Sequence, residues 1–80
     1  MTNTMLLEES IRKSGLKKSK IIEAVGLTYY GFQRKANNVS RFNGEEIMKL
    51  CDVLGITNLE TKEAIFFAHS VDNLSTQAAV

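Results

Sequence analysis

Apolar residues recur at spacings of three and four along most of the chain, and polar residues fill the positions between them. This pattern predicts five short helices, over residues 4–14, 17–25, 29–37, 44–54 and 59–69. The apolar stripes of the first four are Leu6, Leu7 and Ile11; Ile21, Ile22 and Val25; Phe32 and Ala36; and Ile47, Leu50, Cys51 and Leu54. No segment alternates between apolar and polar residues with a period of two, so we expect an all-α fold.

Residues that start and stop helices stand at the ends of these segments. Thr28, Asn43 and Asn58 carry side-chain oxygens that accept a backbone hydrogen bond at a helix start. Glu46 stands three residues after Asn43, which is the spacing of a capping box. The glycines that end helices are Gly15, Gly26 and Gly55.

The connection between the helices at 17–25 and 29–37 is a tight turn. Only Leu27 separates Gly26, which ends one helix, from Thr28, which caps the next. So short a turn makes the two helices cross steeply, as in a helix-turn-helix unit.

Length and composition indicate a single globular domain. Eighty residues, 44% hydrophobic and 24% charged, bury about 60% of the extended chain's surface, which excludes a second core. We expect one domain over residues 1–69 and a flexible tail over residues 70–80. The lone cysteine, Cys51, excludes a disulfide framework within the chain. The longest apolar run, residues 64–68, is too short to span a bilayer, and no secretory signal is visible, so we expect a cytoplasmic protein.

Basic residues are concentrated in the middle of the chain. Residues 12–41 hold eight Lys and Arg residues and one acidic residue, Glu23, which is a net charge of +7 in a chain of net charge +1. Such a segment favours a polyanionic partner. The alternative is a solvated surface on which charges are distributed unevenly.

The segment 18–38, KSKIIEAVGLTYYGFQRKANN, resembles the helix-turn-helix of the phage Cro/C1-type (XRE-like) repressor family. The matching positions are Ile21 facing inward, Val25, Gly26 and Leu27 in the turn, Thr28 as the cap, Phe32 as the buried anchor and Asn37 and Asn38 at the exit. Residues 42–56 and 63–68 are similar to small Cro-like proteins of Gram-positive phages. Three positions depart from the family pattern: Ile22 stands for a small alanine, Lys18 for a glutamine and Asn38 for a glycine.

The resemblance implies a five-helix, lambda-repressor-like DNA-binding domain in the cytoplasm of a bacterial host. It also implies a homodimer that reads two half-sites about one DNA turn apart. Within the helix at 29–37, Phe32 and Ala36 lie on one side, Tyr30 and Arg34 point away from it and Gln33 lies at the flank.

We therefore predict two groups of DNA-contacting residues. The base-reading residues are Tyr29, Tyr30, Gln33 and Arg34. The phosphate-contacting residues are Lys18, Lys20, Thr28, Lys35, Asn37, Asn38 and Arg41. The alternative for the tyrosines is helix packing with the hydroxyl groups in solvent. The alternative for each lysine alone is an ordinary solvated charge.

Other chemistry finds no support in the sequence. His69 has no second histidine or cysteine pair at ligand spacing, and Cys51 falls on an apolar stripe. Gly26 and Gly31 have the spacing of a phosphate-binding loop, but Phe32 and Gln33 replace the required Lys and Ser or Thr. We expect no enzyme activity, no cofactor and no metal ion.

The last predicted helix has apolar residues on every side. Ile65, Phe66 and Phe67 cannot all face so small a core, so we predict a partner interface there. The alternative is that the tail, residues 70–80, folds back over them.

Two functions follow from these observations. The first is a sequence-specific, Cro-like transcriptional repressor in a phage or prophage switch, which binds a double-stranded DNA operator. The second is an antirepressor that binds the phage lysogenic repressor protein, because two tyrosines at the start of a helix suit a protein interface equally well.

Overall fold

Five helices make up the part of the chain that the computed structural model describes, residues 1–69. They are α1 (Thr4–Ser14), α2 (Lys18–Val25), α3 (Tyr29–Ala36), α4 (Gly44–Leu54) and α5 (Leu59–Phe66). No strand occurs within residues 1–69, which confirms the all-α prediction. None of these five helices has the length and apolar character needed to cross a membrane. The predicted flexible tail, residues 70–80, lies outside the described residues.

The helices begin at the predicted caps. The side chains of Thr28, Asn43 and Asn58 each accept a hydrogen bond from the backbone N–H three residues further on. Glu46 accepts the Asn43 N–H in return, at 2.9 Å, so the capping box is complete. Asn3 caps α1 in the same way, a role that the sequence pattern had not indicated. These local bonds replace the partners that the first turn of a helix lacks.

α5 ends three residues earlier than the pattern predicts, because the start of the chain binds its end. The Asn3 N–H donates to the carbonyl of Ile65 at 2.7 Å, and the Ala68 N–H donates to the carbonyl of Met1 at 2.9 Å. The Ile65 carbonyl would otherwise accept the N–H of His69 if the helix continued. Other boundaries shift by one residue only, at Lys17 and Asn37.

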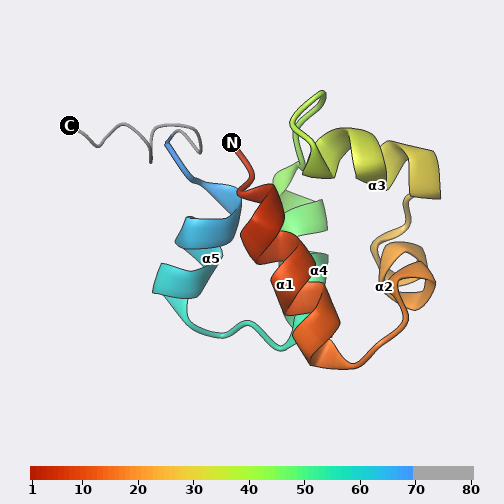
Figure 1. The fold of residues 1–80 in the computed structure, drawn as a ribbon, viewed down its shortest axis with the longest axis horizontal. Coiled ribbons are helices and arrows are strands. Elements are labelled where there is room, and N and C mark those ends of the chain that lie inside the picture. The colour runs from red at the N-terminus through yellow and green to blue at the C-terminus, as the bar shows by residue number, and fades with distance from the viewer. Residues whose placement is uncertain (70–80) are drawn as a thin grey trace.

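The core lies where α4 meets the helices around it. α1 and α2 pack on α4, and α5 packs on α1, as Figure 1 shows with α4 behind α1 and between α5 and α2. Three phenylalanine rings join distant segments: Phe32 and Phe42 have centroids 5.7 Å apart, and Phe42 meets Phe66 edge-on at 5.9 Å. The buried apolar residues are Leu7, Ile11, Ile21, Ile22, Val25, Phe32, Ala36, Phe42, Ile47, Leu50, Cys51, Ile65 and Phe66.

The turn between α2 and α3 sets these helices at a steep angle. Gly26 takes a left-handed conformation with φ of 85°, and the N–H groups of Gly26 and Leu27 both bond to the carbonyl of Ile22. In Figure 1, α2 is seen nearly end-on while α3 lies across the view at the edge of the molecule. α3 is therefore anchored on one side and open on the other.

Candidate nucleic-acid interface

The first turn of α3 carries two exposed tyrosines. Tyr29 is 60% exposed and Tyr30 is 71% exposed, whereas Phe32 on the same helix is completely buried. The tyrosines therefore do not pack in the core, and the helix divides into a buried side and a solvent-facing side. Thr28 acts as the cap, and its hydroxyl oxygen already accepts the Gly31 N–H at 3.0 Å. Thr28 therefore has a structural role as a helix cap. The phosphate contact predicted for it is a second role.

Arg34 lies one turn after Tyr30 and stacks on it. The guanidinium carbon of Arg34 is 5.7 Å from the centre of the Tyr30 ring, and Arg34 is exposed. Gln33 is oriented differently, because it is half-buried and its Oε1 is shielded from solvent without a hydrogen-bond partner among residues 1–69. Three of the four predicted base-reading residues therefore share an open surface, and the carboxamide oxygen of Gln33 is turned away from it.

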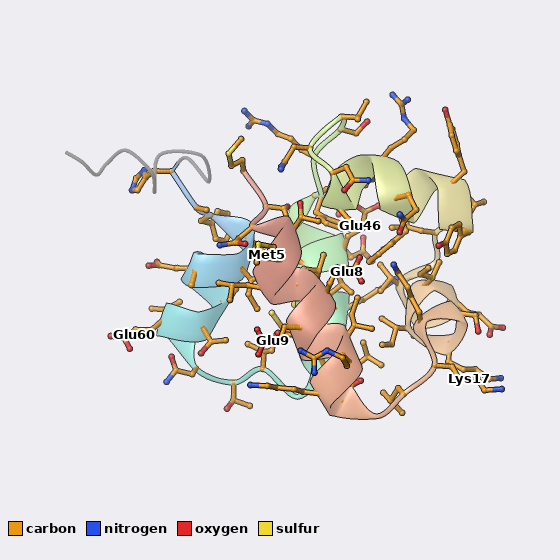
Figure 2. All side chains as sticks on the ribbon, viewed as in Figure 1. Met5, Glu8, Glu9, Lys17, Glu46 and Glu60 are labelled. Carbon is orange, nitrogen blue, oxygen red and sulfur yellow. The ribbon has the colours of Figure 1, made fainter. Side chains whose placement is uncertain are left out.

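Lys18 is held by α1 rather than left free in solvent. Its Nζ lies 3.0 Å from a carboxylate oxygen of Glu8, and it also lies 5.7 Å from the centre of the Tyr29 ring. Figure 2 shows Glu8 on the part of α1 that faces α2 and α3. The charge of Lys18, which we predicted to contact a phosphate, is thus balanced by Glu8. Lys18 also makes a cation–π contact with the ring of Tyr29.

Lys35 is also paired, with Glu46 of α4. The two side chains meet at 2.8 Å and are only 21% and 13% exposed. Partial burial acts to raise the pKa of the Glu46 carboxyl, but bonds from Lys35 and the Asn43 N–H, with the charges of Lys35 and Lys49, outweigh it. The pKa of Glu46 therefore lies below its ordinary value. This pair ties the last turn of α3 to the start of α4.

The two asparagines after α3 have different surroundings. Asn38 takes a left-handed conformation with φ of 67°, the conformation that its glycine-like position requires. Its carboxamide accepts the Thr2 N–H at 2.8 Å and donates to the Thr2 carbonyl at 2.9 Å. Asn37 is exposed and its side chain makes no hydrogen bond within residues 1–69. Asn38 is thus engaged in the fold, while Asn37 remains available for a phosphate.

Acidic residues outside the basic segment reduce its free charge. Glu9 lies 3.9 Å from Arg12 and 3.3 Å from Lys13, and Glu8 and Glu46 pair as described above. The basic residues of the segment that form no ion pair within residues 1–69 are Lys17, Lys20, Arg34 and Arg41. The net charge of +7 counted along the sequence therefore overstates the charge that a polyanion would meet.

The partner interface predicted on the last helix is wrong for two of its three residues. Ile65 and Phe66 are buried in the chain's own core, at 1% and 4% exposure, and only Phe67 stays exposed, at 53%. The reason is that Phe66 packs against the ring of Phe42 and Ile65 joins the same core, whereas Phe67 follows the last helical residue as the C-cap. An open groove remains between α1 and α5, lined in part by Leu6 and Ala64.

The remaining candidate residues form no site. Within residues 1–69 no group of three or more His, Cys, Asp or Glu side chains is placed to hold a metal ion. Cys51 is buried, and burial raises the pKa of its thiol despite the nearby charge of Lys62. The thiol is therefore protonated at neutral pH and poorly reactive.

Comparison with protein-family models, with curated proteins and with solved structures finds no match for this chain. Its function is therefore argued from the geometry of α3 and its surroundings.

Proposed function

We propose that this chain is a sequence-specific DNA-binding regulator, a Cro-like helix-turn-helix repressor of a phage or prophage switch. The observation that carries the proposal is the division of α3 into a buried side, anchored by Phe32, and an open side with Tyr29, Tyr30 and Arg34. An α-helix presented in this way has the width to enter a major groove, where its first turn meets the base edges.

The contacts that we propose follow from which side chains are free. Arg34 donates two hydrogen bonds to a guanine, and the tyrosine rings pack against thymine methyl groups. Lys20, Asn37 and Arg41 are exposed, and we assign them to phosphates. Lys18 and Lys35 are half-buried, and each forms an ion pair, Lys18 with Glu8 and Lys35 with Glu46.

The test is selection of a preferred duplex from a random pool, followed by titration of binding against salt. We expect Arg34→Ala to reduce the preference for the selected sequence by about 1–3 kcal/mol. We expect Lys20→Ala to weaken selected and random duplexes alike and to reduce the salt slope by about 0.9. Lys13→Ala is the matched control, because Lys13 is exposed, pairs with Glu9 and lines the groove between α1 and α5.

An unchanged titration for both Arg34→Ala and Lys20→Ala would contradict this docking of α3. Equal losses in all three variants would indicate a diffuse electrostatic contact, without base reading.

A second candidate function is an antirepressor that binds the phage lysogenic repressor through the same surface. It is favoured by the strong exposure of Tyr29 and Tyr30 beside few uncompensated cations. Tyrosine is common among the residues that dominate binding energy in protein interfaces. Purified lysogenic repressor would then form a complex that Tyr29→Ala disrupts and Lys20→Ala leaves intact, and duplex DNA would not bind at low salt.

The homodimer implied by the family resemblance is also a proposal. Of the three residues predicted to form an interface on the last helix, Phe67 alone is exposed and so remains a candidate contact. Sedimentation of the wild-type protein and of Phe67→Ser, with and without the selected duplex, decides whether a dimer forms through it.

A further inference from the structure

The first four residues of the described chain fasten the exit of α3 to the end of α5. On the α3 side, Thr2 pairs with Asn38, and the Thr4 hydroxyl donates to the carbonyl of Ala36 at 2.5 Å. On the α5 side, the Asn3 N–H bonds to Ile65, and the Met1 carbonyl accepts the N–H of Ala68. These partners are separated from residues 1–4 by at least 32 positions along the chain.

The Asn38 carboxamide pairs with Thr2 as a backbone strand would. Its oxygen accepts the N–H of Thr2, and its nitrogen donates to the C=O of the same residue. Asn38 makes both bonds from a left-handed backbone conformation. Thr2 is 5% exposed, so losing Asn38 would leave its buried backbone groups without partners. Unpaired buried polar groups are costly, which makes this pairing a strong local constraint.

The two ends of α3 are consequently held in different ways. Its first turn carries the exposed tyrosines and is fixed to α2 by the short turn, whereas its last turn is fixed by Lys35 and by residues 1–4. Residues 1–4 contact the exit of α3 and the end of α5 at once, so they link these two regions of the fold.

We propose that residues 1–4 act as a positioning strap, which holds α3 in the orientation that its target requires and couples this orientation to the end of α5. Asn38 and Thr4 are then positioning residues, and Asn38 is not a phosphate ligand. The proposal rests on the DNA-binding function proposed above and deepens it, because it assigns a point of control to the same surface.

The test compares two strap variants with a neighbouring control. Asn38→Gly removes the carboxamide and keeps a residue that readily adopts positive φ, and Thr4→Val removes only the hydroxyl bond to α3. Val39→Ala is the control, since Val39 is next to Asn38, is exposed and makes no strap contact. Thermal melts of all three establish that they fold.

The deciding measurement is amide hydrogen exchange at Asn3 and Ala68, which are far in sequence from position 38. We expect Asn38→Gly to lower protection at both amides about tenfold and Thr4→Val to lower it in the same direction, whereas Val39→Ala leaves protection and DNA binding unchanged. Binding to the selected duplex should fall about three- to tenfold in both strap variants.

The possible outcomes separate the strap from the proposed function. Unchanged protection at Asn3 and Ala68, with weaker DNA binding in Asn38→Gly, would overturn the strap and return Asn38 to the phosphate contacts. Lower protection at Asn3 and Ala68 in Asn38→Gly, together with an unchanged affinity for DNA, would overturn the positioning role of residues 1–4. Wild-type protein that binds no duplex at low salt would overturn the DNA-binding function. The positioning role would then be overturned too, even if Asn38→Gly still lowered amide protection at Asn3 and Ala68.

Discussion

α3 and α5 are alike in length and in the way they start, but they differ in how they meet the core. Each has eight residues and a side-chain cap, Thr28 for α3 and Asn58 for α5. α3 buries two residues a turn apart and leaves its aromatic first turn in solvent, whereas α5 buries two adjacent residues, Ile65 and Phe66, at its last turn.

α3 and α5 differ in how clearly the sequence pattern indicates which side of the helix faces the core. In α3, Phe32 and Ala36 lie on one side of the helix, so the pattern favours that side for the core over the side that carries Tyr30 and Arg34. In the segment of α5 the apolar residues are contiguous from 64 to 68, so the pattern leaves the buried side open. Backbone bonds from residues 1–4 then decide where α5 ends, and Phe66 packs inward against Phe42.

The largest expected effect tests this comparison directly. Phe32→Ala and Phe66→Ala each remove a buried ring from the same aromatic group, and we expect each to destabilise the fold by about 3–5 kcal/mol. Phe67→Ala removes an equally large but exposed ring, and we expect a loss of no more than about 0.5 kcal/mol. Denaturant unfolding measures all three, and a loss in Phe67→Ala as large as in Phe66→Ala would place Phe67 in the core.

The second effect concerns the ion pair that ties α3 to α4; α5 forms no such pair within residues 1–69. The lowered pKa of Glu46 means that its charged form stabilises the fold at neutral pH. This contribution decreases once the pH falls below the ordinary pKa of a glutamate, and it is lost as the pH falls through the lowered pKa of Glu46 in the folded protein. Between pH 6 and pH 3 we expect the wild type to lose about 1 kcal/mol more than Glu46→Gln. Unfolding free energies that fall in parallel for both proteins would show that the pair contributes nothing.

A smaller effect tests the open side of α3. Tyr30→Leu removes the ring on which Arg34 stacks, so we expect sequence preference to fall by about 0.5–1 kcal/mol. Stability should change by no more than about 0.5 kcal/mol, because Tyr30 is exposed. Competition between selected and random duplexes provides the measurement, and a large loss of stability would instead assign Tyr30 to packing.

The smallest effect concerns Glu8, which shares the charge of Lys18. Glu8→Gln frees this cation beside α3, and we expect tighter binding to any duplex and a salt slope steeper by about 0.9. The ion pair is partly exposed, so its loss should cost no more than about 1 kcal/mol of stability. Weaker DNA binding in Glu8→Gln would show that the pair positions Tyr29 and that its charge is of secondary importance.

Much of the fold follows from short-range signals in the sequence. The caps at Thr28, Asn43 and Asn58 and the left-handed Gly26 involve residues within one turn of each other, so local rules identify them. The buried side of α3 was also predicted, because Phe32 and Ala36 lie four positions apart on one side of the helix. The proposed DNA contacts of its open side stay predictions.

The sequence by itself determined the five helices, most of their ends and the two sides of α3, since each of these depends on neighbours a few residues away. The tertiary structure alone decided the pairs Lys18–Glu8, Lys35–Glu46 and Asn38–Thr2, whose partners lie 10, 11 and 36 positions apart. It also decided the end of α5, which depends on the start of the chain. Pairing over such distances depends on how the helices pack together, and no local pattern of residues encodes it.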